Sequence, residues 1–488
     1  MNLYLIGHDY RYAAEQMLLT LFPDERPEYP DGRPTGDRAE LRLMSGTKVT
    51  TVTCVLVYHG QTANGRTSVP NGELTDPAEK DRRLQGAVKR AFYRAAMGIG
   101  LPHRPWGMLT GVRPGKLMTP LLAQGLNDAQ AARQFERQYD VSPARADLVV
   151  RTAHATLRAM ESLGEKDVCL YVGIPFCPTR CAYCSFVSQS VEKSMALVPE
   201  FLQALAREIA ATAEAVRKAG LRVVSLYIGG GTPTTLSARQ LDALCTQLAA
   251  AFDLSALREF TVEAGRPDTI TADKLQVLRA HRVDRISVNP QTLDDRVLDT
   301  IGRRHTAQDI YDALRLVRET GGFAVNMDLI AGLPGDTPDG FRATLEQVLA
   351  LAPENVTVHT LSRKRGSNLM AQDAPIPDGA AVGEMLDFAG TVLPRAGYAP
   401  YYLYRQKFMS GGFENVGWTR PGQENLYNIC IMEELCSILA MGGGASTKLV
   451  RPNGGRLERH IDPKYPTEYI ANIDRICAAK AELEAFFQ

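Results

Sequence analysis

The chain lacks a net charge, because its 488 residues include 55 lysines and arginines and 55 aspartates and glutamates. A general nucleic-acid binder carries a basic excess, so this balance argues against that class and leaves room only for a local basic pocket. No stretch approaches the roughly 18 uninterrupted apolar residues of a membrane span. Residues 1–14 have no continuous apolar core and carry His8, Asp9 and Arg11, so no signal peptide is predicted either.

The chain has an odd number of cysteines. There are nine of them, in a long chain without export signals, and reduced thiols fit such a chain better than a disulfide framework does. Fixed-period repeats and low-complexity tails are absent as well. We therefore predict a cytoplasmic protein with no membrane span and no nucleic-acid partner.

Residues 1–163 predict a small α+β domain with a helical linker. Leu3–Ile6 and Lys48–Tyr58 are rich in the apolar and β-branched residues typical of strands. Asp76-Pro77 starts a helix that reaches about Met97, because aspartate before a first-turn proline is typical of a helix start.

From residue 164 to residue 397, short apolar strands alternate with amphipathic helices. Six strand-then-helix units in series predict a parallel sheet, which the right-handed crossover rule curls into a partial TIM-like (βα)6 barrel. Active residues then belong at the carboxyl ends of the strands. The predicted strands are Cys169–Ile174, Val223–Ile228, Phe260–Glu263, Arg285–Val288, Ala324–Leu329 and Asn355–Thr360.

Residues 398–488 break this pattern and predict a mostly helical C-terminal region. The aromatic stretch Tyr398–Tyr404 and a glycine-rich loop precede a helix expected around Ile431–Ala440, and a last helix is expected from Pro466 onward. The chain is thus α/β in class. Its length, at about 150 residues a domain, agrees with three domains, 1–163, 164–397 and 398–488.

Three cysteines, Cys177, Cys181 and Cys184, follow directly on the first barrel strand. With three and two residues between them, they can wrap one face of a cubane cluster from a single loop, and soft sulfur ligands suit Fe–S clusters and zinc. No fourth cysteine lies near this loop to close an electron-transfer cluster. One iron is then left open to chelate the amino and carboxylate groups of S-adenosylmethionine (SAM), whose sulfonium is cleaved by one electron.

This loop has two other interpretations, a structural zinc site and three unpaired core cysteines. Zinc normally takes four protein ligands, with paired spacings on two separate loops, and that pattern is missing here. The six remaining cysteines are interpreted as small core residues. They are Cys54, Cys169, Cys245, Cys430, Cys436 and Cys477.

Glycines and carboxylates stand at the ends of later strands. The triple glycine Gly229–Gly231 lets the backbone approach a ligand closely, or else forms an ordinary turn between strand and helix. No Gly-Lys-Ser/Thr follows, so it is not a phosphate-binding P-loop. The carboxylates of Glu263 and Asp328 can accept ribose hydroxyls or the SAM ammonium, or can instead cap a helix or pair with an arginine.

Together these residues resemble the radical SAM signature in the setting of HemN/HemW-like oxygen-independent coproporphyrinogen III oxidases. The N-terminal domain and the C-terminal end are similar to the HemZ-type branch of that family. The landmarks are Ile174-Pro175-Phe176, Gly229–Gly231 with Thr232-Pro233, Gln291, Asp328 with Gly332-Leu333-Pro334-Gly335, Pro105-Trp106-Gly107, Tyr427-Asn428 and Met441–Ala445.

The resemblance implies a role for particular residues. Cys177, Cys181 and Cys184 would ligate a 4Fe–4S cluster, Tyr171 and Glu263 would contact the SAM bound to it, and Gly230 would line the methionine end. Tyr427 and Asn428 stand where the oxidases have a catalytic pair near the substrate. A second SAM would lie at Tyr183, Gly231, Thr232, Gln291, Arg303 and Asp328.

The resemblance also implies a reaction, the oxidative decarboxylation of coproporphyrinogen III propionates to vinyl groups, which gives protoporphyrinogen IX. A one-electron donor such as flavodoxin or ferredoxin would supply the reducing electron. Arginine suits anionic propionates, so Arg363 and Arg365 after the sixth strand are candidate anchors, with a solvated charged loop as the alternative. Lys364, Arg405 and Lys407 belong to the same basic set.

The sequence departs from the family at several positions. Gly173 replaces a common histidine, and only Gln291 of the family's Gly-Val-Gln survives. The His-Asn…Tyr-Trp motif of the related haem chaperones is missing around Tyr427-Asn428, which argues against a haem carrier. A haem carrier of the HemW type and another radical tetrapyrrole reaction, such as methylation with ring opening, stay as alternatives.

Overall fold

The computed structural model describes residues 1–32, 34–184, 189–190, 194–362, 375–406, 410–451 and 457–487. The chain divides into two compact units. Unit 1 consists of Met1–Val112 and Leu126–Leu148, and unit 2 consists of Arg113–Gly125 and Val149–Gln488. No helix in the described ranges is long and apolar enough to cross a membrane.

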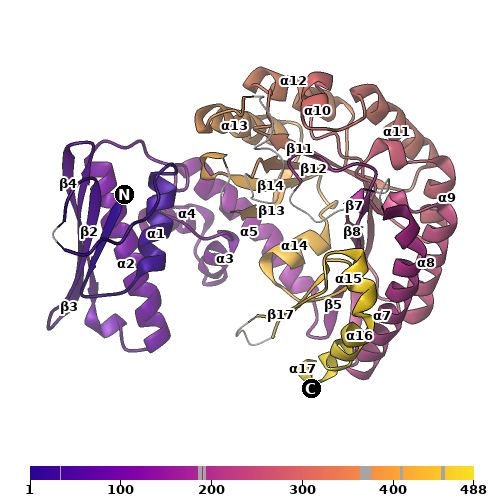
Figure 1. The fold of residues 1–488 in the computed structure, drawn as a ribbon, viewed down its shortest axis with the longest axis horizontal. Helices are drawn as coiled ribbons and strands as arrows, with labels where there is room; N and C mark the ends of the chain where they lie inside the picture. Colours follow the sequence, from indigo (N-terminus) through magenta and orange to yellow (C-terminus); the bar gives the residue numbers. More distant parts are fainter. Residues whose placement is uncertain are drawn as a thin grey trace. The chain divides into compact units, whose positions relative to one another are not determined.

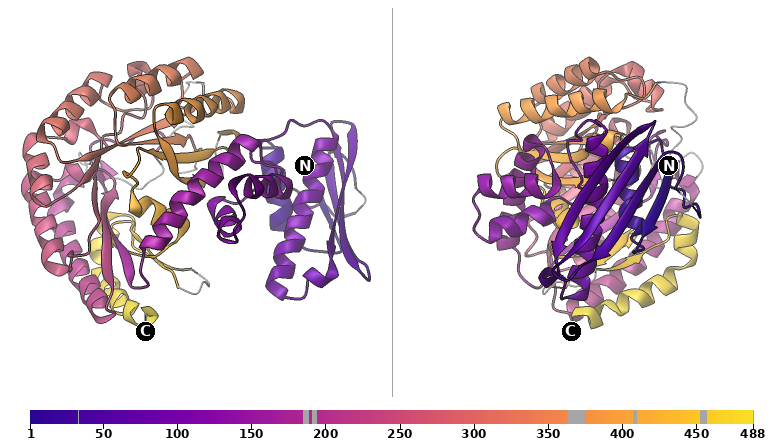
Figure 2. Two further views of the ribbon diagram at one scale, coloured as in Figure 1. Left: turned by 180° about the vertical axis from the view of Figure 1, so that it is seen from behind. Right: turned by 90° about the vertical axis from the view of Figure 1, so that its left-hand side faces the viewer.

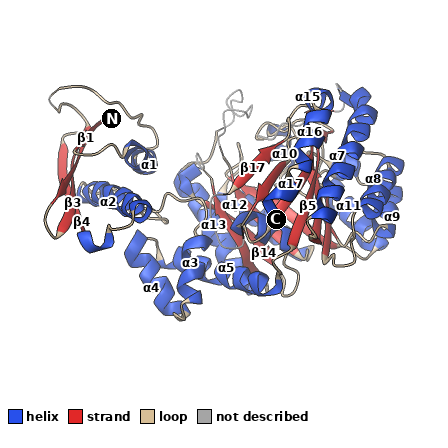
Figure 3. Cartoon of the chain, turned by 90° about the horizontal axis from the view of Figure 1, so that it is seen from below, coloured by secondary structure: helices blue, strands red, loops and turns tan. Residues whose placement is uncertain are grey.

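Unit 1 is built on a four-stranded sheet in the order β1-β2-β3-β4 (Figure 2, right). β1 pairs in parallel with β2, whereas β3 and β4 continue the sheet as antiparallel neighbours. The helices α1 and α2 pack on one face of this sheet (Figure 3). The elements are β1 (Asn2–Ile6), α1 (Arg11–Leu21), β2 (Arg38–Ser45), β3 (Val49–Tyr58), β4 (Gln61–Pro70), α2 (Pro77–Gly98) and α4 (Asp128–Tyr139).

Helix α2 begins where the sequence predicts. The Asp76 side chain accepts a hydrogen bond from the backbone N–H of Glu79, and Pro77 occupies the first helical position, where its missing N–H costs nothing. The apolar face of α2 packs on the sheet so closely that Gly65 of β4 lies against the backbone of Ala91.

Unit 2 contains an eleven-stranded sheet in the order β13-β14-β12-β11-β10-β9-β8-β5-β15-β16-β17. The six predicted strands are confirmed as neighbouring parallel strands at its centre, and their nearly continuous burial is typical of a sheet covered on both faces. They are β5 (Asp167–Ile174), β8 (Arg222–Gly230), β9 (Glu259–Glu263), β10 (Arg285–Ser287), β11 (Ala324–Ala331) and β12 (Asn355–Thr360).

Helices line the outer side of the curved sheet (Figure 1). Two of them, α8 and α11, start at capping boxes in which Ser237 and Thr306 exchange hydrogen bonds with the third helical residue. This arrangement leaves the inner face and the carboxyl edge of the strands for a site. The helices are α7 (Val198–Lys218), α8 (Ala238–Ala251), α9 (Ala272–Ala280), α10 (Asp295–Thr300), α11 (Ala307–Thr320), α12 (Pro338–Ala350) and α13 (Gly379–Arg395).

The C-terminal region contains four helices, and it also adds five strands to the sheet. β13 (Ala399–Arg405) and β14 (Glu414–Thr419) extend one edge, whereas β15 (Ser437–Gly442), β16 (Ser446–Leu449) and β17 (Glu458–Ile461) extend the other. The helices are α14 (Leu426–Glu433), α15 (Pro466–Ala471), α16 (Ile473–Ala481) and α17 (Leu483–Phe487).

The helix expected around residues 431–440 is wrong from Glu434 onward. Helix α14 ends because Glu434 takes a left-handed conformation, with φ of 56°. The six residues of β15 are then all buried as a strand that runs parallel to β5.

Candidate active site

The cysteine loop begins at the carboxyl end of β5, at the edge where the sequence places active residues. The thiols of Cys177, Cys181 and Cys184 are reduced and partly buried. Thr232 Oγ1 donates to Cys177 Sγ over 3.5 Å, and Arg266 Nη1 donates to Cys181 Sγ over 3.9 Å. Three accessible sulfurs beside polar donors fit a thiolate-ligated cluster, whereas structural thiols sit in apolar surroundings.

Glycines at the end of β8 let the backbone lie against this loop. Gly230 has φ of +107°, which side chains rarely adopt, and a Cβ at Gly231 would lie 2.5 Å from the carbonyl oxygen of Phe176. The backbone N–H groups of Gly231 and Thr232 donate to the carbonyls of Ile174 and Phe176. The triple glycine thus packs closely on the cysteine loop, and its approach to a ligand stays a prediction.

Glu263 lies at the end of β9 and faces two tyrosines. Tyr227 Oη donates to Glu263 Oε1 over 2.7 Å. Burial raises the pKa of Glu263 to about 7, against the lowering effect of the Tyr227 hydrogen bond, and the charge of Asp328 adds to the rise. A carboxyl group in this state becomes a carboxylate readily when a cation binds next to it.

Tyr171, Tyr227 and Tyr427 form a stack of rings on the inner face of the sheet. The ring centroids of Tyr227 and Tyr427 lie 4.4 Å apart, and that of Tyr171 lies 6.1 Å and 6.0 Å from them. Asn428 Nδ2 donates to the buried Tyr401 Oη over 3.2 Å. The structure thus brings Tyr171 and Tyr427 together and points Asn428 at the aromatic strand β13.

Arg303 and Gln291 line the same edge from the loops after α10 and β10. Arg303 donates to Tyr183 Oη over 3.4 Å and to the carbonyl of Gly265 over 2.6 Å. Both side chains are more than nine-tenths buried, yet Gln291 Oε1 and Arg303 Nε have no hydrogen-bond partner among the described residues. Because buried polar atoms are normally paired, these two atoms fit a polar ligand.

Asp328, at the middle of β11, is held by side-chain amides. Asn289 and Asn326 donate to its two carboxylate oxygens over 2.8 Å each, and His359 Nε2 lies 3.8 Å away. Burial acts to raise the pKa of Asp328, but the hydrogen bond and charge of His359 outweigh it and lower the pKa. The pKa of Asp328 is therefore lowered, which favours its ionised form, whereas the pKa of Glu263 is raised to about 7, which favours its neutral form.

Two residues of this edge were missed in the sequence. Arg266 follows β9 and contacts the cysteine loop through Thr179 as well, over 2.9 Å. Both ring nitrogens of the buried His305 lack a partner within the described ranges. Burial, and then the charges of Arg303 and Arg266, lower the pKa of His305 to about 3, so the ring is neutral. Arg266 follows a predicted strand end by three residues, which alone did not single it out, and His305 follows none.

Of the basic residues predicted to bind propionates, the structure describes Arg405 alone. Arg363, Lys364, Arg365 and Lys407 lie outside the described residues. Arg405 is buried at the end of β13, where its Nη2 donates to the carbonyl of Gly412 over 2.7 Å.

The start of the cysteine loop rests on β15. A Cβ at Gly442, which has φ of +99°, would lie 2.3 Å from the carbonyl oxygen of Gly173. The buried Glu208 of α7 accepts from the backbone N–H of Gly442 over 2.8 Å and lies 2.9 Å from Lys480 Nζ of α16. Gly173, where the family commonly has histidine, is thus packed against a glycine turn that a buried ion pair supports.

Comparison with known proteins gives a consistent set of relatives. The model of the radical SAM superfamily matches residues 171–348. The oxygen-independent coproporphyrinogen-III oxidase-like protein HemZ of Bacillus subtilis is 39% identical over 389 residues, 78% of each chain. The haem chaperone HemW of Lactococcus lactis is 29% identical and covers 66% of this chain and 80% of its own.

A solved structure of the same kind of protein also matches this chain. Coproporphyrinogen III oxidase (HemN) from Escherichia coli, described as a radical SAM enzyme, matches with a TM-score of 0.51 and 25% identity. The match covers 66% of this chain and 72% of that one.

Proposed function

Since the chain belongs to the radical SAM superfamily, and within it to the family of HemZ, HemN and HemW, we propose that it is an oxygen-independent coproporphyrinogen III dehydrogenase. It would convert propionate side chains of coproporphyrinogen III to vinyl groups and so form protoporphyrinogen IX in the cytoplasm. One edge of the sheet carries this proposal. There the loop with the three cysteines lies near Glu263, whose carboxyl pKa is raised to about 7. Gln291 Oε1 and Arg303 Nε, at the same edge, are buried and have no hydrogen-bond partner among the described residues.

The cofactors of this superfamily are a 4Fe–4S cluster and SAM. Cys177, Cys181 and Cys184 would hold the cluster, and Tyr171, Gly230 and Glu263 would bind the SAM next to it. When bound, the two supply one-electron cleavage of the sulfonium and abstraction of a hydrogen atom. Glu263 would ionise on contact with the SAM ammonium, since a nearby cation lowers a carboxyl pKa.

A second SAM, or another polar ligand, would use the remaining buried groups. Arg303 would donate through its unpaired Nε, Gln291 would accept or donate through its amide, and Asp328 would accept hydroxyl groups. Tyr183, Gly231 and Thr232 complete this set in our proposal. Because His305 is neutral, it can donate one hydrogen bond and accept another without adding charge.

The substrate would lie against the inner face of the sheet. Tyr427 and Asn428 are proposed to support it from beneath, because Tyr427 is buried in the ring stack and the Asn428 amide donates to Tyr401. Arg363 and Arg365 are proposed to pair with propionates, and a flavodoxin- or ferredoxin-type donor is proposed to supply the electrons.

The test is turnover of the anaerobic protein with a reconstituted cluster, given SAM, a reductant and coproporphyrinogen III. The expected products are carbon dioxide and a divinyl porphyrinogen, with deoxyadenosine formed in step. Deoxyadenosine without vinyl products would reject the substrate and keep the enzyme class. A methylated linear pigment would assign methylation with ring opening instead.

A haem carrier is the second candidate, because relatives named haem chaperone HemW match the same region. In this chain Tyr427 is buried in the ring stack, and histidine does not precede Asn428. Stoichiometric haem binding by the purified protein, with no SAM cleavage in the presence of coproporphyrinogen III, would favour the carrier over the enzyme.

A further inference from the structure

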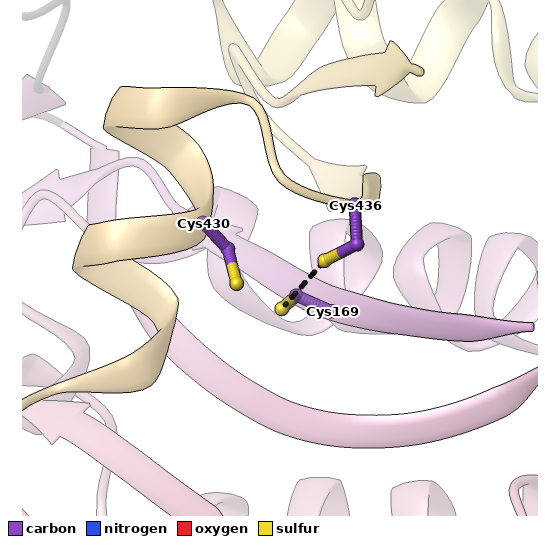
Figure 4. A group of neighbouring side chains, drawn as sticks. All are labelled: Cys169, Cys430 and Cys436. Atoms are coloured by element: carbon purple, nitrogen blue, oxygen red, sulfur yellow. Dashed lines mark hydrogen bonds between the residues drawn. The ribbon is translucent and has the colours of Figure 1, made fainter. Parts of the chain in front are cut away.

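Three other cysteines of unit 2, which we call the thiol triad, meet in the interior. Cys169 comes from β5, Cys430 from α14 and Cys436 from the segment between α14 and β15 (Figure 4). Their sulfur atoms all lie within 4.8 Å of one another, and Cys169 Sγ and Cys436 Sγ are 3.6 Å apart. Three separate elements thus direct one sulfur each toward a common point.

The surroundings of the triad are apolar. The cysteines are 0%, 0% and 8% exposed and pack in a cluster with Val224, Ile438 and Tyr427. Within the described part of the chain, no fourth histidine, cysteine, aspartate or glutamate joins the group. Any ion bound here would therefore have three sulfur ligands and no water-exposed position.

The spacing fits a three-coordinate ion. Three sulfurs about 2.3 Å from an ion in their own plane lie about 4 Å from one another. The observed separations, 3.6 Å for Cys169 and Cys436 and at most 4.8 Å for the other pairs, are in the range of this value. Zinc sites of the structural kind need a fourth ligand, which disfavours zinc.

Burial narrows the choice further. The triad lies in the interior, and the described residues supply only three sulfur ligands, so an ion that is stable with three sulfurs and no water fits the site.

From the sulfur geometry, the burial and the missing fourth ligand, we propose that the thiol triad is a binding site for a soft cation of the Cu(I) type. Soft thiolate ligands suit Cu(I), zinc and Fe–S clusters, and the missing fourth ligand disfavours zinc and a closed cluster. The site is separate from the cysteine loop: Cys169 lies near the start of β5, whereas that loop follows its end at Ile174. The proposal stands independently of the reaction proposed above.

The test uses the full-length chain with Cys177, Cys181 and Cys184 replaced by alanine, so that the cluster thiols cannot compete. Under anaerobic conditions Cu(I) is titrated against a chromophoric Cu(I) chelator. We expect one Cu(I) per chain, and X-ray absorption should show three sulfur atoms about 2.3 Å from copper. No binding, or a copper environment of nitrogen and oxygen, would overturn the proposal.

Two further substitutions assign the ion to the triad. In the same background, Cys436→Ala should weaken Cu(I) binding by more than the 10- to 100-fold that changes outside the ligand shell produce. Cys245→Ala, which removes a buried cysteine of α8 outside the triad, is the matched control and should retain one Cu(I). Equal binding by both variants would overturn the proposal. If Cys436→Ala does not fold, Cys430→Ser replaces it, with loss of one sulfur from the absorption spectrum as the readout.

Discussion

The two sets of three cysteines in unit 2 are assembled in opposite ways. Cys177, Cys181 and Cys184 come from a single loop and are partly exposed beside Thr232 and Arg266. In the thiol triad, Cys169 and Cys436 are 267 residues apart in sequence and meet only because β15 pairs with β5. Sequence spacing can therefore reveal metal ligands that lie on one loop. It cannot reveal ligands that come from distant segments and meet only in the folded chain.

The largest expected effect is the difference in bound iron between variants that lack one thiol of each set. Cys181→Ala should lower bound iron and abolish SAM cleavage, a loss of about 10⁴-fold or more, because the cluster loses a covalent ligand. Cys436→Ala should retain about four irons per chain after reconstitution, since its thiol lies in the other set. Iron and sulfide analysis with electron paramagnetic resonance of the reduced protein measures both. Equal iron loss in the two variants would show that the sets are not independent.

The parts of the fold that could be predicted are those with a local sequence pattern. The six central strands are short apolar runs bounded by turns, and each is confirmed. β15 was missed because a run of six apolar and small residues, Ser437–Gly442, has no periodicity that separates a buried strand from a helix. Its partner strand β5 lies 269 positions away in the sequence, as the pairing of Gly173 with Gly442 shows, so no local signal exists.

The residues of the candidate site also differ in whether a local sequence pattern predicts them. Cys177, Cys181 and Cys184 follow from spacing, whereas the roles of Gln291, Arg303 and Asp328 came from a family resemblance and stay predictions. Arg266 and His305 become visible only in the structure, because their importance depends on which strand ends lie next to each other. The thiol triad is the extreme case, since its members were interpreted as ordinary core cysteines.

A second fold-assembled group tests how much the C-terminal helices support the cysteine loop. Lys480, 3% exposed, lies 2.9 Å from Glu208 Oε1 and 3.5 Å from Asp462 Oδ2. Lys480→Met should lower the free energy of unfolding of unit 2 by about 3–5 kcal/mol, because it leaves a buried carboxylate uncompensated. Urea unfolding measures this change.

The control is the double variant Lys480→Met with Glu208→Gln, which removes the second charge and keeps an acceptor for the Gly442 N–H. It should recover part of the lost stability. A loss below about 1 kcal/mol in the single variant would mean that water already reaches this pair.

Glu263 gives the third test, through pH. Its pKa is 4.5 in an unfolded chain and is raised to about 7 in the fold, so its contribution to stability is fully present below pH 4.5 and is lost as pH rises through 7. The full difference corresponds to roughly 3 kcal/mol, and solvent access reduces it to about 1–3 kcal/mol. Glu263→Gln should therefore match the wild type at pH 5 and equal or exceed its stability at pH 8. Parallel stability profiles of the two proteins would contradict the raised pKa.

The smallest expected effect concerns Arg266, which the fold brings to the locally encoded loop. Its Nη1 lies 3.9 Å from Cys181 Sγ, and its Nε pairs with Asp268 over 3.2 Å. Positive charge and N–H···S hydrogen bonds favour the reduced form of a cluster, so Arg266→Met should lower the reduction potential by an amount on the order of tens of millivolts. Arg266→Lys keeps the charge and should recover part of the shift, whereas Cys436→Ala should leave the potential unchanged. Potentiometric titration of the three variants decides the matter: a shift in Cys436→Ala as large as that in Arg266→Met would mean that the buried triad and the cysteine loop are coupled through β5.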